Sequence, residues 1–200
     1  MRFLLISALA TTLSSVAIAA PVSSQPATVE LTTRATTVEE SVNIVGDLSR
    51  KAQALQSPAQ QISILNGPLI IVGQGPFPAI IQGFTEIINA ADAFANKYGE
   101  GETVFDEAGC SDITTSYKQF TRVNQQLMNI LIGKAGLFST VPIIGQPVQA
   151  VLRQVEVRYD ALGIFFVGQC EGKGNADIES NFQELRKTVT AAVNAYNSIA

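Results

Sequence analysis

Apolar residues recur every three or four positions along almost the whole chain from Thr37 onward, and this spacing constrains the fold more than any other feature. It predicts amphipathic helices, each with one apolar face. The first helix should begin after Thr37, because Thr37 and Glu40 have the spacing of a capping box. Its expected apolar face consists of Val38, Val42, Val45, Leu48, Ala52 and Leu55.

Further helix signals follow the first helix. Ser57-Pro58-Ala59-Gln60 combines an N-cap serine, a proline at the first helical position and a glutamine at the third, so a second helix should begin there and end at Asn66-Gly67-Pro68. Later helices are predicted at Ile80 to Tyr98, about Asp112 to Phe138, Pro147 to Phe166 and Ile178 to Ile199. This pattern does not fit a strand-rich or alternating βαβ chain. We therefore predict an all-α, up-and-down bundle of five to six amphipathic helices.

One segment, NGPLIIVGQGPFPAIIQG (residues 66–83), raises the question of nucleotide binding. Gly73-Gln74-Gly75 follows an apolar run, and Asp92 lies about where a dinucleotide-binding fold places its acidic residue. However, Pro78 occupies the position of the third glycine. Pro76 and Pro78 also lack the backbone N–H groups that such a turn directs at a pyrophosphate. We therefore interpret the segment as an apolar loop that leads into a helix.

The N-terminus has the pattern of a secretory signal peptide. Residues 1–19 combine a short basic start, an apolar stretch and a small-residue cleavage pattern. Residues 20–36 are rich in Ser, Thr and Pro, which predicts a flexible leader. Any sugars there should be O-linked, because the chain contains no Asn-X-Ser/Thr acceptor. Residues 37–200 should form a single helical-bundle domain, in a protein that is secreted to the extracellular space or the cell wall.

The chain contains no histidine, which restricts the chemistry it can perform. Ser-His-Asp and Cys-His catalysis and histidine metal sites are excluded, and two cysteines cannot complete a four-thiolate zinc site. The net charge of −4, without a basic stripe, argues against nucleic acid as a partner. No apolar stretch has the length of a bilayer span. We therefore expect a non-catalytic protein without a metal, a cofactor or a transmembrane segment.

A carboxylate pair is the remaining candidate for catalysis. Glu156 and Asp160 lie four positions apart on a predicted helix, close enough to act together. They are interleaved with Arg153 and Arg158, which favours a solvated charged face. A carboxylate-dependent enzyme therefore ranks last among the functional hypotheses.

The two cysteines should meet in space. Cys110 lies just before the fourth predicted helix and Cys170 at the end of the fifth, so antiparallel packing brings both to the same end of the bundle. In an exported protein such a pair forms a disulfide. Closing a loop of about sixty residues would stabilise the fold by ~4 kcal/mol in the chain-entropy model.

Two predicted loops are unusually apolar. Ile70–Pro76 and Ile143–Pro147 each pass from an apolar turn into a helix through a proline. Loops are normally polar because they face water. These two should therefore either be buried as plugs at the end of the bundle or be exposed to bind a hydrophobic partner. The sequence leaves both alternatives open.

Several segments resemble a family of secreted fungal proteins. KAGLFSTVPIIGQPVQAVLRQVEVRYDAL (134–162) and TAAVNAYNSIA (190–200) resemble the fungal hydrophobic surface-binding protein A and cell-wall galactomannoprotein family. LQSPAQQISILNGPLIIVGQGPFPAIIQGF (55–84) and NILIGKAGLF (129–138) are similar to one branch of it, and the match spans about 37–200. The resemblance implies an all-α, non-catalytic secreted protein, often O-mannosylated, that adsorbs to hydrophobic surfaces or holds a lipid among its helices.

A lipid would lie between the apolar faces of these helices. Long helices with aromatic side chains can enclose a slot, and an acyl chain buried there would gain ~0.8 kcal/mol per methylene. The residues expected to contact a lipid or a hydrophobic surface are Ile71, Phe77, Ile80, Phe84, Ile87, Leu127, Leu131, Phe138, Leu152, Phe165 and Phe166. The same side chains could instead pack a filled core.

A second functional hypothesis remains beside lipid binding. The protein could be a structural wall protein or a secreted effector or elicitor that acts through protein–protein contacts, and its interior would then be well packed. We expect a monomer in either case. O-linked glycans on the leader would be its route to cell-wall polysaccharide.

Overall fold

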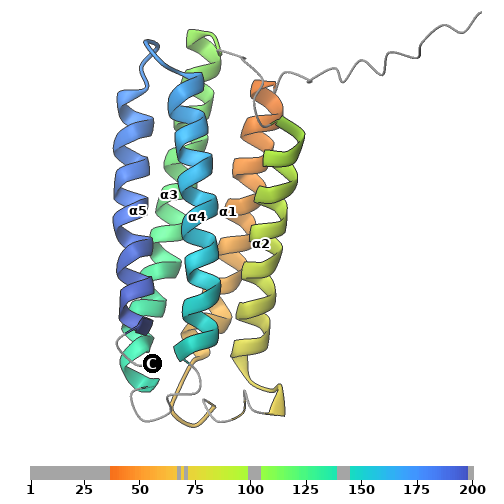
Figure 1. The fold of residues 1–200 in the computed structure, drawn as a ribbon, viewed down its shortest axis with the longest axis vertical. Helices are drawn as coiled ribbons and strands as arrows, with labels where there is room; N and C mark the ends of the chain where they lie inside the picture. Colours follow the sequence, from red (N-terminus) through yellow and green to blue (C-terminus); the bar gives the residue numbers. More distant parts are fainter. Residues whose placement is uncertain (1–36, 67–68, 70–71, 99–104, 139–144, 198–200) are drawn as a thin grey trace, which may run out of the picture. The chain divides into compact units, whose positions relative to one another are not determined.

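The computed structural model describes residues 37–66, 69, 72–98, 105–138 and 145–197, all within one unit that spans Thr33–Ala200. These ranges contain five α-helices, short 3₁₀ segments and no β-strand (Figure 1). The elements are α1 (Val38–Gln61), α2 (Pro76–Tyr98), α3 (Glu107–Ala135), η2 (Gly136–Phe138), α4 (Gly145–Gln169) and α5 (Ala176–Asn197). Consecutive α-helices run in opposite directions, which confirms the predicted all-α, up-and-down bundle.

The helix starts follow local capping chemistry. At α1 the backbone N–H of Glu40 donates to Thr37 Oγ1 (3.1 Å), and the Glu40 carboxylate accepts from Thr37 N (3.3 Å), so the predicted capping box is confirmed. Asp106 caps α3 by accepting a hydrogen bond from Gly109 N at 2.7 Å. Pro76 opens α2, where its missing N–H costs nothing because the first N–H groups of a helix have no intrahelical partner.

The prediction of a second helix start at Ser57 is wrong. α1 continues through Ser57-Pro58 and ends at Gln61. The proline removes one helical hydrogen bond. The turn nevertheless remains helical, and Leu55, Ala59 and Ile62 around it are buried in the core. Lys134 of α3 also donates its Nζ to the carbonyl oxygen of Gln60 (2.8 Å), which satisfies a carbonyl group at the end of α1.

The remaining predicted helices are present, with differences at their ends. α3 begins at Glu107 instead of about Asp112, because Asp106 supplies its N-cap. α4 begins at Gly145, ahead of Pro147, because a proline is tolerated in the first turn of a helix. The periodicity therefore located the helices, while the caps determined where each one begins.

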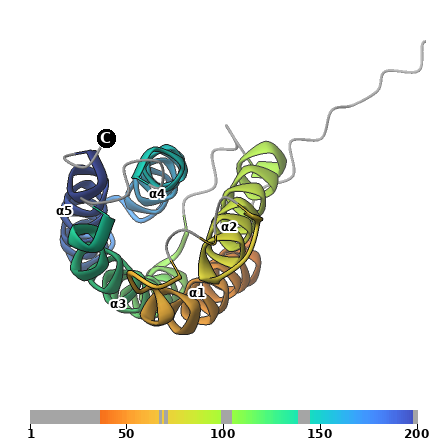
Figure 2. The ribbon, with the colours of Figure 1, turned by 90° about the horizontal axis from the view of Figure 1, so that it is seen from below.

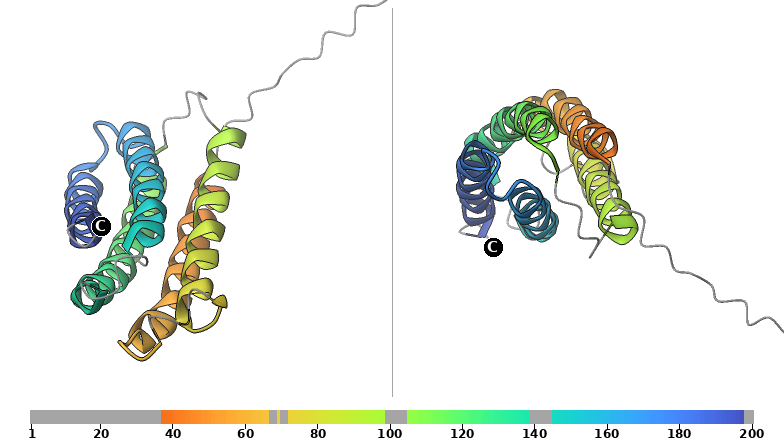
Figure 3. Two further views of the ribbon diagram at one scale, coloured as in Figure 1. Left: turned by 60° about the horizontal axis from the view of Figure 1, so that its bottom comes forward. Right: turned by 90° about the horizontal axis from the view of Figure 1, so that it is seen from above.

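The helices form a curved layer with one helix inside it. α2, α1, α3 and α5 follow one another around an arc, and α4 lies in its concave opening (Figure 2). Figure 3 shows the same arc from the opposite end. Within the arc each helix packs against its neighbour, whereas α4 packs chiefly against α5 and α2. The hydrophobic core consequently fills the space between α4 and the inner side of the arc.

Two glycines allow neighbouring helices to approach closely. A Cβ atom at Gly83 of α2 would lie 2.3 Å from Cδ2 of Leu55 in α1. A Cβ atom at Gly163 of α4 would lie 2.2 Å from Cδ2 of Phe182 in α5. Both separations are shorter than any non-bonded contact, so an alanine at either position would force the facing side chain or its helix to shift.

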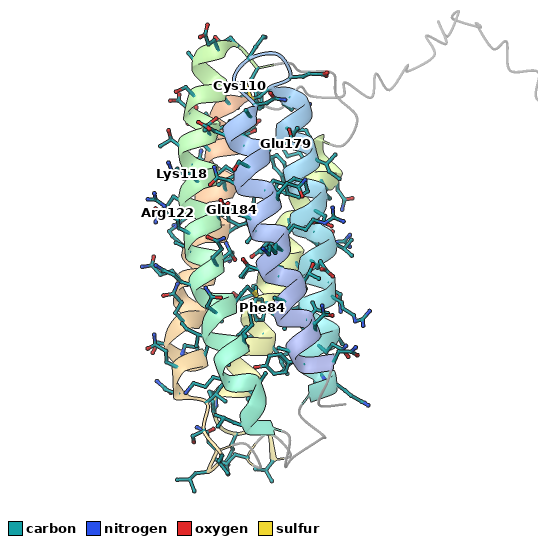
Figure 4. All side chains as sticks on the ribbon, turned by 90° about the vertical axis from the view of Figure 1, so that its left-hand side faces the viewer. Phe84, Cys110, Lys118, Arg122, Glu179 and Glu184 are labelled. Atoms are coloured by element: carbon teal, nitrogen blue, oxygen red, sulfur yellow. A yellow bond between two sulfur atoms is a disulfide. The ribbon has the colours of Figure 1, made fainter. Side chains whose placement is uncertain are left out.

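The predicted disulfide between Cys110 and Cys170 is confirmed. Their Cα atoms lie 5.6 Å apart, and both side chains are buried. The bond joins the start of α3 to the residue that follows α4, at the end of the bundle where Cys110 is labelled in Figure 4. A backbone hydrogen bond from Phe105 N to Gln169 O (3.0 Å) reinforces this connection.

Candidate functional site

Most of the predicted lipid contacts converge on one core. The following residues are all at most 1 % exposed and belong to the same hydrophobic cluster: Phe77, Ile80, Phe84, Ile87, Leu127, Leu131, Leu152 and Phe166. Phe165 is partly buried and packs against that cluster. Ile71 and the side chain of Phe138 lie outside the described residues. The structure therefore brings the predicted residues of α2, α3 and α4 together, with Phe165 at the margin of the core.

Aromatic rings span the distance between α4 and the arc. Phe120 of α3 stands edge to face with Tyr159 of α4, with their ring centroids 4.9 Å apart. Tyr117 and Phe166 make a second such contact at 5.9 Å. Aromatic side chains therefore occupy the region in which the sequence placed a lipid slot. A ligand can enter this region only if some of these rings move.

A polar pair lies inside this aromatic core. The hydroxyl group of Tyr159 donates to Asn124 Oδ1 (2.6 Å), and Asn124 Nδ2 donates to the carbonyl oxygen of Phe120 (2.9 Å). Burial, with a smaller contribution from Tyr117, raises the pKa of Tyr159 above its usual value. The Tyr117 hydroxyl is also buried and has no hydrogen-bond partner among the described residues. These hydroxyl groups therefore stay neutral at physiological pH.

An apolar cleft of about 200 Å³ lies between α2 and α4. It is lined by Ala91, Asp92, Phe94 and Ala95 of α2 and by Arg158, Ala161, Leu162 and Phe165 of α4. Alanines leave the gap, because they are too short to fill the space between the two helices. Phe94 and Phe165 meet edge to face inside the lining, with centroids 5.5 Å apart.

One ion pair joins the two walls of this cleft. Arg158 Nε of α4 lies 2.6 Å from Asp92 Oδ1 of α2. Both side chains remain partly exposed, at 40 % and 36 %. Among the described residues of the lining, they are the only charged ones. The cleft thus combines an apolar surface with one solvent-accessible charged pair.

The cleft is small compared with known ligand sites. Pockets for small molecules usually measure about 300–1,000 Å³. The present volume of about 200 Å³ would hold only part of a long acyl chain. Phe165 of the lining also contacts Phe166 of the core, with their ring centroids 5.2 Å apart.

Sequence reasoning identified only Phe165 among the residues that line the cleft. Ala91 and Phe94 lie within the helix predicted at Ile80 to Tyr98, and Leu162 within the one predicted at Pro147 to Phe166, but none of them was assigned to a site. Asp92 had been considered only for a nucleotide ribose. The alanines carry a weak signal, since small residues on facing helices can leave a gap. That signal becomes specific only when the partner helix is known.

A different, polar groove of about 1,010 Å³ runs between α3 and α5. Figure 4 shows this face, with Lys118 and Arg122 on α3 and Glu184 on α5. The rest of the lining is mostly hydroxyl, amide and charged side chains. Charges of both signs and a shortage of apolar surface make this groove unsuitable for an acyl chain.

The two carboxylates that were considered for catalysis contact α5. Glu156 accepts a hydrogen bond from the Thr190 hydroxyl, and Asp160 Oδ2 lies 3.4 Å from Arg186 Nε. Burial raises the pKa of Asp160, while Arg186 lowers it and Glu156 raises it to a lesser extent. The prediction was a solvated charged face. These side chains instead bind α4 to α5, and neither of them lines the apolar cleft.

Two other kinds of site were sought in the described part of the chain. It contains no group of three or more Cys, Asp and Glu side chains arranged to hold a metal ion. Across the same residues, no helix combines the length and the hydropathy that a bilayer crossing requires.

Much of the described loop between α1 and α2 is exposed. Ile62 is buried at 1 %, but the large apolar side chains that follow it are strongly or partly accessible: Ile64 (60 %), Leu65 (91 %), Leu69 (39 %) and Val72 (65 %). Asn66 shapes the loop, since its Oδ1 accepts from Ser63 N (2.8 Å) and its Nδ2 donates to Gln61 O (2.6 Å). Within the predicted apolar loop Ile70–Pro76, Val72 is exposed, whereas Ile70 and Ile71 lie outside the described residues. Residues 139–144 of the second apolar loop lie outside the description.

Comparison with known proteins places the chain by its fold. No protein-family model matches the sequence, and no curated protein sequence matches it. Ligand binding domain 1 of the Penicillium marneffei MP1 protein, solved in complex with arachidonic acids, superposes with a TM-score of 0.59 and 12 % identity. The match covers 78 % of this chain and 98 % of that one.

A second solved structure superposes equally well. The crystal structure of AFMP4P in complex with palmitic acid gives a TM-score of 0.60 at 11 % identity, and the match covers 80 % of this chain and 99 % of that one. At such low identities the likeness concerns the fold. The all-α fold implied by the sequence resemblance is confirmed, and the chain adopts the helical fold of these two proteins.

Proposed function

We propose that this protein is a secreted, non-catalytic binder of long-chain fatty acids or similar single-chain lipids. The observation that carries the proposal is the apolar cleft between α2 and α4, on a fold whose two solved neighbours contain arachidonic and palmitic acid. An acyl chain in the cleft would be stabilised by about 0.8 kcal/mol for each buried methylene. The signal-like residues 1–19 and the Ser/Thr/Pro-rich residues 20–36 support a place in the cell wall or outside the cell.

The neighbouring aromatic rings suggest a path for the rest of the acyl chain. Phe94 and Phe165 line the cleft and also contact Phe166, with centroid separations of 6.2 and 5.2 Å. If the ring of Phe165 rotates, the cleft becomes continuous with the region around Phe166. The predicted core residues would then contact the acyl chain of the ligand, as the lipid-binding hypothesis requires.

Filling the cleft should weaken fatty-acid binding. Ala161→Trp places an indole ring between α2 and α4, where Ala161 is exposed and lines the cleft. If the indole ring excludes only two methylenes of the acyl chain from the cleft, the binding free energy weakens by ~1.6 kcal/mol. The affinity of delipidated protein for palmitic acid, measured by titration calorimetry, should therefore fall about ten-fold or more. Ala191→Trp, at an exposed alanine of α5 outside the cleft, is the matched control and should bind as the unaltered protein does.

Two results would contradict this placement or the function itself. If both tryptophan variants lose the same affinity for palmitic acid, or if neither loses any, the ligand does not bind in the α2–α4 cleft. Native mass spectrometry provides the broader test. If the secreted protein carries no lipid and the delipidated protein takes none up, the alternative of a structural wall protein or an effector acting through protein contacts would be favoured.

The exposed α1–α2 loop favours adsorption to hydrophobic surfaces as a second function. Replacing Ile64 and Leu65 with serine should weaken adsorption to alkyl-coated beads by about ten-fold or more, because burial of each large apolar side chain contributes ~1.5–3 kcal/mol. The helical circular dichroism should not change, since both side chains are exposed. Val157→Ser provides the control, because Val157 is similarly exposed (57 %) but lies on α4. An equal effect of the control would show that the loop has no special role.

A further inference from the structure

The ion pair at the α2–α4 cleft leaves part of its cation available. Arg158 contacts Asp92 through Nε, and it makes no other polar contact with the described residues. A guanidinium group has five N–H donors and can bind more than one carboxylate. Because Arg158 is 40 % exposed, its remaining donors can be reached from solvent at the apolar lining.

The composition of the lining selects a ligand class. Apart from Asp92 and Arg158, every lining residue is alanine, leucine or phenylalanine. A ligand that buries an apolar chain there would therefore meet Arg158 as the one cation among the described residues of the lining. Asp92 already neutralises part of that charge, which disfavours head groups with more than one negative charge. A single carboxylate joined to an unbranched apolar chain satisfies both conditions.

Given the fatty-acid binding proposed above, on which this step rests, we propose that Arg158 binds the ligand carboxylate at the cleft and that Asp92 competes for the same guanidinium. In the ligand-free protein the Asp92–Arg158 pair joins α2 to α4 across the cleft. The incoming carboxylate shares or replaces the contact with Asp92. Binding of the head group is thereby coupled to separation of the two helix walls.

The test compares two ligands with the same chain length, palmitic acid and 1-hexadecanol, at neutral pH. The unaltered protein should prefer the acid by about ten-fold, as expected for a hydrogen bond between charged groups at a partly exposed site. Arg158→Met keeps an apolar side chain of similar reach, so it should lose this preference while its affinity for the alcohol is kept. Asp92→Asn removes the competing carboxylate and should increase the preference for the acid.

Controls distinguish the head-group site from a general effect of charge. Arg153→Met makes the same change at an exposed position of α4 outside the cleft and should keep the preference. Arg158→Lys should keep it in part, because a cation remains. An equal loss for acid and alcohol in Arg158→Met would overturn the inference by showing a structural role. An equal loss of the preference in Arg153→Met would overturn it by showing non-specific attraction.

The two proposals fail in different ways. If the unaltered protein binds palmitic acid and 1-hexadecanol equally well, fatty-acid binding stands and the role of Arg158 is overturned. If it binds neither compound, the proposed function is overturned, and the head-group site with it.

Discussion

Replacing both cysteines with alanine, Cys110→Ala with Cys170→Ala, should lower the free energy of unfolding by about 4 kcal/mol. The bond links residues 60 positions apart. In the chain-entropy model, loss of such a cross-link raises the conformational entropy of the unfolded chain and so stabilises the unfolded state by this amount. Both sulfur atoms are buried, so the smaller alanine side chains add a modest packing loss. Urea unfolding followed by circular dichroism would measure the change.

A reductant provides the control for this result. Unaltered protein unfolded in the presence of dithiothreitol should show the lowered stability of the double variant, whereas the variant itself should not respond to the reductant. If oxidised protein and double variant unfold at the same urea concentration, the bond does not stabilise the bundle. Other contacts, such as the hydrogen bond from Phe105 N to Gln169 O, would then be sufficient to hold the start of α3 against the end of α4.

Phe166→Ala should cost about 3–5 kcal/mol of stability, the range for removing a fully buried aromatic side chain. Phe166 has no exposed surface and contacts the rings of Phe94, Tyr117 and Phe165. Its removal leaves a cavity directly beside the α2–α4 cleft. Urea unfolding of the delipidated protein would measure the loss, and the milder Phe166→Leu extends the test if the alanine variant is too unstable.

This cavity also provides a test of the path of the acyl chain. Palmitic acid at one fixed concentration, about 100 times its dissociation constant for the unaltered protein, should stabilise the unaltered protein by ~2.7 kcal/mol. In Phe166→Ala the gain should be larger than in the unaltered protein, because the chain fills the new cavity. Leu48→Ala is the matched control: it also removes a fully buried side chain, but α1 contributes no residue to the cleft. An equal gain in both variants would exclude a path past Phe166.

Local sequence patterns were sufficient for much of the fold. The spacing of apolar residues predicts which face of each helix is buried, because 3.6 residues per turn place such residues on one side. The Thr37–Glu40 capping box was predictable because all its atoms lie within one turn. The Cys110–Cys170 bond followed from antiparallel packing of the two helices that carry the cysteines. Ser57-Pro58 misled the same reasoning, because α1 continues through this local signal for a helix start, and residues on both sides of it, Leu55 and Ala59, are buried in the core.

The candidate site depended on contacts that no local pattern contains. The sequence identified Phe84, Leu127, Leu152 and Phe166 as apolar, but a periodic face predicts burial without indicating whether the buried space is filled or empty. Aromatic pairs such as Phe120 and Tyr159 fill that space, and only their positions in three dimensions show it.

By itself, the sequence determined the all-α class, the up-and-down order of the helices and the absence of histidine chemistry, because these follow from periodicity and composition. The tertiary structure decided that α4 lies in the concave side of the arc, where it forms an apolar cleft with α2. It also brought Asp92 within 2.6 Å of Arg158. Helix packing selects such partners through the shape of whole surfaces, so residues far apart in the chain become neighbours without any signal in their own segments.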